Sequence, residues 1–337
     1  MKTYIEKCLS GEHLTIDEAS SALATIMNGQ ATDTQIAGLM IALRAKGETV
    51  DELVGFARTM REHGIKISIE DSSAIDMCGT GGDGLGTFNI STMASFVVAG
   101  AGVTVAKHGN RSVSSQSGSA DVLTSLGVNV QCSSETVKSC INSIGIGFMF
   151  APLFHPAMKH AGKARTELGV RSFFNMIGPL TNPAGVKRQL LGVYKAQVAP
   201  LLAGALQKLG AEKACVVHSD DGLDEVTLSG GTIVHEVNEN EQLRKYHLQP
   251  KDFGFSQYSL ESFRGGDKNN NATITTEVLQ GKKCPARDIV IANAALGIYI
   301  GGKTKTIIEG KKKAEESIDS GKALEKLQQL IQYTNQS

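Results

Sequence analysis

Tryptophan is absent from this sequence of 337 residues, and aromatic residues make up only 5% of it. Proteins that bind single-stranded nucleic acid stack bases on aromatic side chains, and such a platform is poorly supplied here. The chain has no excess of charge of either sign, because 34 Lys and Arg balance 34 Asp and Glu. The sequence therefore predicts no nucleic acid and no membrane as partners, and an anionic ligand must be held by local groups.

Long hydrophobic runs are missing as well. No segment approaches the roughly 18 apolar residues that a membrane span needs, and the chain opens without a charged and then apolar leader. Its 6 cysteines include no C-x-x-C pair. We therefore expect a cytoplasmic protein with reduced, buried and inert thiols, long enough to build its core without disulfides.

The first 64 residues carry repeated helix start signals. Thr15 with Glu18, Thr32 with Gln35 and Thr49 with Glu52 each fit the capping box, in which side chain and backbone satisfy each other's free groups. Apolar residues recur at helical spacing behind these caps, which is typical of a core face or a subunit interface. The sequence predicts a small N-terminal α-helical domain.

From about residue 73, short apolar runs alternate with helical stretches. This alternation favours an α/β domain with a mostly parallel central sheet flanked by helices, whose ligands bind at the carboxyl ends of the strands. A polar loop is expected at 267–271, a long helix at 288–300 and a charged helical tail at 305–333. The expected strands are 74–78, 103–106, 146–151, 190–194 and 214–218.

Glycine, in contrast, is abundant, with 37 residues in the chain and a cluster directly after the first expected strand. Glycines let the backbone adopt positive φ and bring N–H groups close to an anion, and a following helix adds its partial positive charge. The segment fits neither a Rossmann nor a P-loop motif. It predicts a phosphate-binding loop, built on Gly79, Gly81, Gly82, Gly84 and Gly86.

A second polar segment, 107–119, follows the second expected strand. Lys107 and Arg111 supply positive charge, and several serines supply short hydroxyl donors for phosphate oxygens. If the two strands are neighbours, this segment lies beside the glycine-rich loop.

Several long motifs follow one another along the chain. On these motifs the chain resembles the anthranilate phosphoribosyltransferase family of tryptophan biosynthesis. They are Cys-Gly-Thr-Gly-Gly-Asp-Gly at 78–84, Phe-Asn-Ile-Ser-Thr at 88–92, Lys-His-Gly-Asn-Arg at 107–111, Gly-Ser-Ala-Asp at 118–121, Asn-x-x-Gly-Pro-Leu-Thr-Asn-Pro at 175–183, Gly-Leu-Asp-Glu at 222–225 and Ser-Gly-Lys-Ala at 320–323.

The resemblance implies a pentosyltransferase that moves the 5-phosphoribosyl group from phosphoribosyl pyrophosphate (PRPP) to the amine of anthranilate and releases pyrophosphate. It implies two Mg²⁺ ions per subunit, held by Ser91, Asp224 and Glu225, whereas Asp220 and Asp221 are expected to be solvated. The implied PRPP-binding residues are Gly79, Gly82, Asp83, Thr87, Asn89, Ile90, Ser91, Thr92, Lys107, His108, Gly109, Asn110, Arg111, Ser112, Val113, Ser114, Ser115 and Ser119. The implied anthranilate-binding residues are Gly79, His108, Asn110, Pro152, His155, Met158 and Arg165.

The resemblance also implies a domain division and a homodimer. The helical domain spans 1–70 and is joined by a mid-chain helical segment near 165–185, and the PRPP-binding α/β domain spans 71–337. No general base is assigned, since an aniline amine is already neutral. Lys163, Ser172 and Thr124 depart from common family residues without removing an implied ligand.

Two alternative functions remain open at this stage. A pyrimidine nucleoside phosphorylase shares the fold, but it is expected to carry a Lys-His-Ser-Thr-Gly-Gly type of loop. A non-enzymatic relative that binds nucleic acid is disfavoured by the charge balance and the scarce aromatic residues.

Overall fold

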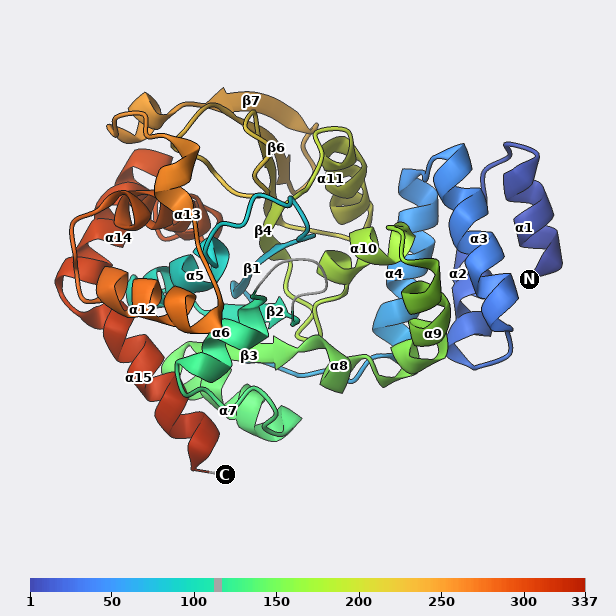
Figure 1. The fold of residues 1–337 in the computed structure, drawn as a ribbon, viewed down its shortest axis with the longest axis horizontal. Helices are drawn as coiled ribbons and strands as arrows, with labels where there is room; N and C mark the ends of the chain where they lie inside the picture. Colours follow the sequence, from blue (N-terminus) through green and yellow to red (C-terminus); the bar gives the residue numbers. More distant parts are fainter. Residues whose placement is uncertain (112–116, 337) are drawn as a thin grey trace.

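The structure is a computed structural model that describes residues 1–111 and 117–336. Its N-terminal part is a group of helices (Figure 1), and capping boxes form at Thr15, Thr32 and Thr49 as the sequence predicts. These helices are α1 (Lys2–Leu9), α2 (Ile16–Met27), α3 (Asp33–Lys46) and α4 (Val50–His63).

A later part of the chain returns to complete this helical group (Figure 1). The rings of Phe56 and Phe173 stack with centroids 4.3 Å apart, and Arg61 Nε donates to the Leu180 carbonyl at 2.7 Å. The returning elements are α9 (Lys159–Leu168), α10 (Phe173–Ile177) and the 3₁₀ turn Gly178–Thr181.

Within the described residues, seven strands form one sheet in the order β3-β2-β1-β4-β5-β6-β7. Strands β1 to β5 are parallel, and β6 and β7 are antiparallel additions at one edge. The five predicted strands are present, with ends shifted by at most three residues. The strands are β1 (Ile75–Gly79), β2 (Val105–Gly109), β3 (Ile146–Phe150), β4 (Arg188–Gly192), β5 (Lys213–Ser219), β6 (Thr232–Asn238) and β7 (Arg244–Leu248).

Helices cover the sheet and divide the apolar interior into two main clusters. One cluster joins the sheet to α5 (Ile90–Gly100), α13 (Pro285–Ile300), α14 (Ile307–Asp319) and α15 (Lys322–Asn335). The other joins α11 (Val198–Lys208) and sheet residues such as Val216 to the N-terminal helices. The helical part thus shares an apolar core with one face of the sheet.

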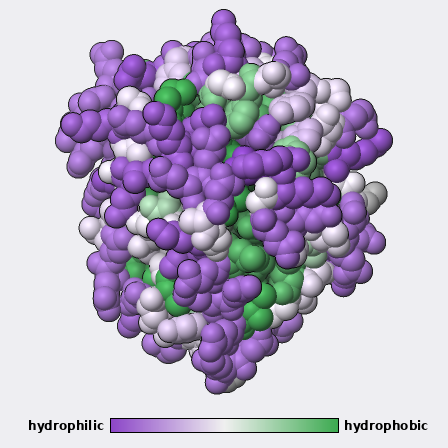
Figure 2. Space-filling model, turned by 90° about the vertical axis from the view of Figure 1, so that its left-hand side faces the viewer, coloured by the Kyte–Doolittle hydropathy of each residue, from purple (hydrophilic) through white to green (hydrophobic). Residues whose placement is uncertain are grey.

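The remaining helices and turns lie around the α/β part. They are α6 (Ser119–Ser125), α7 (Ser134–Ile144), α8 (Ala151–Phe154), α12 (Lys268–Leu279) and the 3₁₀ turns Pro156–Met158, Pro250–Phe253 and Leu260–Phe263. The face turned away from the helical part is mostly hydrophilic, with a narrow apolar strip (Figure 2).

One local prediction is wrong. The polar segment 267–271 is the start of α12, because the Asp267 side chain accepts hydrogen bonds from the N–H groups of Asn269 and Asn270. The cap and the burial of Asn271 and Ala272 outweigh the poor helix propensity of the asparagines.

Five of the six cysteines are buried and free, and Cys284 is partly exposed. Among the described residues, no helix combines the length and the hydropathy required to cross a bilayer.

Candidate functional site

The candidate site lies at the carboxyl ends of β1 and β4, where the strand order reverses. Gly79 at the end of β1 is in register with Gly192 at the end of β4. The Thr80 N–H donates to the Gly192 carbonyl at 2.9 Å, and the Tyr194 N–H donates to Thr80 Oγ1 at 3.1 Å. Open parallel sheets bind ligands in the crevice at such a reversal.

The glycine-rich loop leaves β1 with its backbone turned into the left-handed region. The φ angles lie between 66° and 79° at Gly81, Gly82, Gly84 and Gly86. A residue with a side chain would be strained in this conformation. Within residues 1–111 and 117–336, the N–H groups of Gly82, Asp83 and Gly84 have no hydrogen-bond acceptor. These donors are available to an anion.

Asp224 and Glu225 reach this loop from the segment after β5. The Gly81 N–H donates to Asp224 Oδ2 at 3.0 Å, and the Ser91 N–H donates to Glu225 Oε1 at 3.0 Å. A Cβ at Gly79 would lie 2.8 Å from Asp224 Oδ2, so a larger residue there would displace this carboxylate. The structure therefore brings Ser91, Asp224 and Glu225 together.

Both carboxyl groups have raised pKa values. Burial is the main cause, and the negative charge of Asp83 beside Asp224, and of Asp224 beside Glu225, adds to it. A divalent cation would relieve this repulsion. No cluster of three or more His, Cys, Asp or Glu forms a metal site among the described residues. Mg²⁺ fits nevertheless, since it is commonly bound by one or two carboxylates together with water and substrate phosphates.

The segment carrying these carboxylates is held by its own hydrogen bonds. Ser219 Oγ donates to the Glu225 carbonyl. The Asp221 carboxylate accepts the Thr227 hydroxyl at 2.6 Å and the Leu223 N–H at 3.2 Å. Asp221 is thus a structural residue of the loop, and the expectation that it is merely solvated is wrong.

The end of β2 and the segment after it contact β1 and the start of α5. Lys107 is buried and its Nζ donates to the Met77 carbonyl on β1, and burial lowers the pKa of this amine. Asn89 Nδ2 donates to the Ser117 carbonyl at 3.1 Å. Arg111 pairs with Asp121 at 2.9 Å and lies 5.7 Å from the centroid of the Phe150 ring.

Ser119 Oγ donates to the Asn110 carbonyl at 3.1 Å and so ties α6 to the end of β2. Four residues named from the sequence lie outside the described residues: Ser112, Val113, Ser114 and Ser115.

Two imidazoles pack together beside the end of β2. The ring centroids of His108 and His155 are 5.2 Å apart. Burial, with the nearby His155 and Lys107, lowers the pKa of His108 to about 3, and burial lowers the pKa of His155 to about 4. His108 Nε2 and both ring nitrogens of His155 have no partner among the described residues. They are neutral, buried groups.

The other residues named for the acceptor lie on α8, the following 3₁₀ turn and α9. The Met158 N–H donates to the His155 carbonyl at 3.0 Å, and Pro152 is exposed on α8. Arg165 is half-buried on α9, with its guanidinium carbon 5.1 Å from the centroid of the Phe174 ring.

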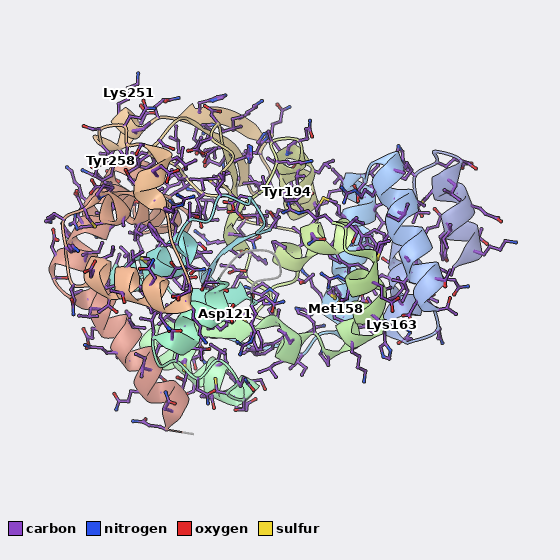
Figure 3. All side chains as sticks on the ribbon, in the orientation of Figure 1. Asp121, Met158, Lys163, Tyr194, Lys251 and Tyr258 are labelled. Atoms are coloured by element: carbon purple, nitrogen blue, oxygen red, sulfur yellow. The ribbon has the colours of Figure 1, made fainter. Side chains whose placement is uncertain are left out.

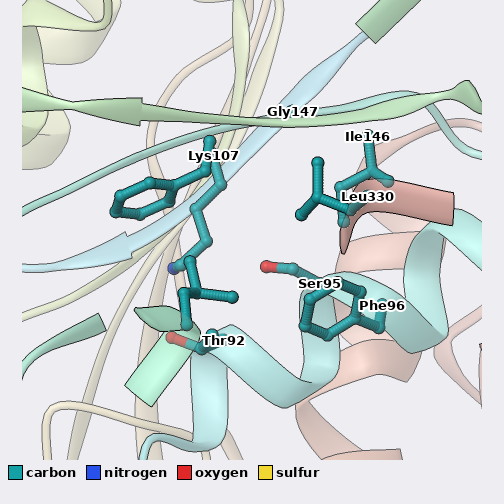
Figure 4. A pocket seen from close by; sticks show the side chains of 9 residues that line it. Thr92, Ser95, Phe96, Lys107, Ile146, Gly147 and Leu330 are labelled. Atoms are coloured by element: carbon teal, nitrogen blue, oxygen red, sulfur yellow. The ribbon is translucent and has the colours of Figure 1, made fainter. Parts of the chain in front are cut away.

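A small cavity behind Lys107 is too small for a substrate (Figure 4). Its volume is about 10 Å³, room for one water molecule, and it lies between α5, β2, β3 and α15. Thr92 Oγ1, on its wall, has no partner among the described residues. A larger pocket of about 200 Å³ lies outside the glycine-rich loop, next to Phe88 and Arg264.

The structure adds three residues that no sequence motif indicated. Arg171 donates through Nη2 to the Gly82 carbonyl, and its guanidinium carbon lies 4.3 Å from the centroid of the Tyr194 ring. Figure 3 places Tyr194 at the boundary between the helical and α/β parts. Asn293 of α13 binds the backbone of Val226, next to Glu225. These roles can be recognised only from contacts between residues that are far apart in the sequence.

Two of the departures noted in the sequence have side-chain partners. Lys163 forms a surface ion pair with Asp33 at 3.2 Å. Thr124 Oγ1 donates to the Ala120 carbonyl within α6 at 2.7 Å, whereas the buried Ser172 hydroxyl has no partner among the described residues.

Two family models match most of the chain. A glycosyl transferase family helical bundle domain matches residues 2–64, and a glycosyl transferase family a/b domain matches residues 71–324. The anthranilate phosphoribosyltransferase of Pelotomaculum thermopropionicum is 50% identical over 334 residues, covering 99% of this chain and 96% of that protein. The one from Syntrophobacter fumaroxidans is 52% identical over 333 residues, covering 99% and 98%.

Solved structures agree with this likeness. The crystal structure of anthranilate phosphoribosyltransferase from Thermus thermophilus has a TM-score of 0.93 at 40% identity, covering 98% of this chain and 99% of that one. The enzyme from Saccharomyces cerevisiae in complex with PRPP and Mg has a TM-score of 0.91 at 30% identity, covering 100% and 98%.

Proposed function

Because this chain belongs to the anthranilate phosphoribosyltransferase family of glycosyltransferases, we propose a role for each part of the site in that reaction. The enzyme transfers the 5-phosphoribosyl group of PRPP to the amine of anthranilate and releases pyrophosphate, a step of tryptophan biosynthesis. None of the relatives named above is a nucleoside phosphorylase or a nucleic-acid-binding protein.

The glycine-rich loop and the end of β2 form the PRPP site. The observation that carries this proposal is the row of N–H groups at Gly82, Asp83 and Gly84, which have no acceptor within the described residues. Thr87, Asn89, Ile90, Ser91 and Thr92 continue the loop into the first turn of α5, where the helix dipole favours an anion. Lys107 to Arg111 and Ser119 complete the site.

Ser91, Asp224 and Glu225 would hold two Mg²⁺ ions per subunit. A yeast relative binds PRPP and Mg, and the raised pKa values of the two carboxyl groups here support a cation between them and the phosphates. Bound there, Mg²⁺ would neutralise charge on the departing pyrophosphate.

Arg165, His108, Asn110, Pro152, His155 and Met158 would bind anthranilate, with Gly79 at its boundary with PRPP. A yeast relative binds 4-fluoroanthranilate. In this chain Arg165 supplies a cation for the carboxylate, and Phe174 holds its guanidinium in place. The rings of His108 and His155 are neutral, and their nitrogens would form hydrogen bonds to anthranilate without adding a charge to the site.

These residues would position the two substrates and stabilise the charge on the leaving group, and none needs to act as a strong base. The amine of anthranilate is neutral at physiological pH, so its lone pair can attack the anomeric carbon as the bond to pyrophosphate breaks. Loop amides and Lys107 would stabilise the charge that develops on the leaving group. The amine proton then leaves to water or to the departing pyrophosphate.

The enzyme would act as a cytoplasmic homodimer. Leu9 of α1 is 70% exposed and Ile41 of α3 is 42% exposed, and these apolar side chains support the helical domain as the contact surface. The domains would divide at residue 70, with the segment near 165–185 joining the helical part.

An assay of PRPP, anthranilate and Mg²⁺, followed by loss of anthranilate fluorescence, tests these roles. Asp224→Asn/Glu225→Gln should abolish Mg²⁺-dependent turnover. Asp319→Asn, on the distant α14, is the matched control and should keep it. Turnover with an unchanged Mg²⁺ requirement in the double variant would remove both carboxylates from the site.

A further inference from the structure

Arg171 joins four separate parts of the chain at the edge of the candidate site. It lies in the connection between α9 and α10 and is half-buried. Its guanidinium donates to the Gly82 carbonyl and stacks on Tyr194, which follows β4. Its own carbonyl accepts a hydrogen bond from Arg44 of α3. The helical part therefore contacts the glycine-rich loop through the Arg171 side chain.

The contact sets the direction of one peptide group. In a trans peptide the carbonyl of Gly82 and the N–H of Asp83 point in opposite directions, and among the described residues the chain has no cis peptide. While Arg171 holds the carbonyl, the Asp83 N–H faces the other way, and no acceptor takes it within the part of the chain that the structure describes. A free carbonyl in its place would repel an anion.

Gly82 and Arg171 are also matched in space. Gly82 has φ of 79°, and a Cβ there would overlap the Arg171 guanidinium. The stacked Tyr194 ring restricts the guanidinium from the other side. The arginine can therefore reach the carbonyl only because residue 82 has no side chain.

We propose that Arg171 is a positioning residue for PRPP: its hydrogen bond to the Gly82 carbonyl orients the loop so that the Asp83 N–H binds an anionic group of the donor. The proposal rests on the assignment of the glycine-rich loop as the PRPP site. Arg171 acts through the loop and on the donor alone, so its loss weakens donor binding without a matching effect on anthranilate.

The test measures both Michaelis constants for Arg171→Ala, Arg171→Lys, Gly82→Ala and the double variant Arg171→Ala/Gly82→Ala. Arg171→Ala should raise the constant for PRPP about tenfold, as the loss of one charge-assisted hydrogen bond predicts, and leave that for anthranilate within about twofold. Arg171→Lys should raise the constant for PRPP less than Arg171→Ala does, since an ammonium keeps the charge but cannot stack as the planar guanidinium does. The double variant should be no worse than the more affected single variant.

Arg264→Ala is the matched control. Arg264 lies at the end of the same loop, where its backbone bridges Thr87, and its side chain is exposed and paired with Glu261. An equal rise in the PRPP constant for Arg264→Ala would overturn the proposal, since loss of positive charge alone would then explain the effect.

Two further results distinguish the role of Arg171 from the assignment of the glycine-rich loop as the PRPP site. A rise for Gly82→Ala with no change for Arg171→Ala would overturn the role of Arg171 and leave the loop as the donor site. No change for either variant would overturn both.

Discussion

The side chain of Asn293 pairs with the backbone of Val226 in both directions. Its Oδ1 accepts the Val226 N–H at 2.9 Å, and its Nδ2 donates to the Val226 carbonyl at 2.8 Å and to the Ile289 carbonyl at 2.9 Å. Asn293 is fully buried on α13. It therefore fixes the residue that follows Glu225, and the carboxylate pair depends on a helix far away in sequence.

Replacing this asparagine should loosen the carboxylate pair. Asn293→Leu leaves the N–H and the carbonyl of Val226 without their side-chain partner in the interior, and the free energy of unfolding should fall by about 3 kcal/mol. The Mg²⁺ concentration for half-maximal activity should rise as Glu225 loses its fixed position. Urea denaturation and Mg²⁺ titration measure the two effects. The exposed Asn269→Leu should change neither, and an unaltered Mg²⁺ requirement in Asn293→Leu would contradict the role.

Arg165 should act on one substrate only. Arg165→Ala removes the cation that we assign to the anthranilate carboxylate, and the Michaelis constant for anthranilate should rise about thirtyfold while that for PRPP stays within about twofold. Lys163 is the matched control, because it lies on the same helix but pairs with Asp33 at the surface. Steady-state kinetics with each substrate varied in turn decides the point. Equal effects on both constants would place Arg165 outside the acceptor site.

The His108 and His155 pair should make stability depend on pH. Both native pKa values, about 3 and about 4, lie below the usual histidine value, so the unfolded chain takes up protons first as the pH falls. The stabilisation from neutral burial is full above about pH 7 and is lost as the pH falls below about 6.5, by roughly 2 kcal/mol for each ring at pH 5.

The variant His155→Gln removes one of these two titrations. Urea denaturation at pH 7 and pH 5 should then show a smaller loss than in the parent protein. The exposed His247→Gln serves as the control and should leave the loss unchanged. A loss of equal size in His155→Gln and the parent would show that His155 is protonated in the native state.

Two helical glycines should respond in opposite ways to the same substitution. A Cβ at Gly55 of α4 would lie 2.8 Å from the Ala19 Cβ and overlap the Ile16 carbonyl, so Gly55→Ala should destabilise the protein by about 2 kcal/mol. A Cβ at Gly38 of α3 would meet only Ile5 Cδ1 at 3.5 Å, so Gly38→Ala should stabilise it by about 0.5–1 kcal/mol. Thermal or urea unfolding of the two variants compares them directly.

Local signals in the sequence predict much of this fold. Capping boxes at Thr15, Thr32 and Thr49 form as expected because each depends on residues three positions apart. The buried strands follow from short apolar runs. The helix that begins at 268 is not predicted, because the asparagines after the Asp267 cap have poor helix propensity and the burial of Asn271 and Ala272 cannot be read from the sequence.

Part of the candidate site can likewise be predicted from the sequence, and part cannot. The glycine-rich loop and the Asp224-Glu225 pair are visible in the sequence, because each motif is contiguous. Arg171 and Asn293 are not, since their partners Gly82 and Val226 lie 89 and 67 positions away in the sequence. The structural role of Asp221 cannot be predicted either, because the sequence does not distinguish an acidic side chain that binds its own loop from one in water.

The apolar core shared by the N-terminal helices and the later part of the chain has a consequence for synthesis on the ribosome. Phe56 and Arg61 are made early, but their partners Phe173 and Leu180 emerge more than a hundred residues later. The helices translated first must wait, with apolar faces uncovered, until the returning segment has left the exit tunnel. A pause in translation before residue 180 would therefore prolong the period in which the nascent chain depends on chaperones.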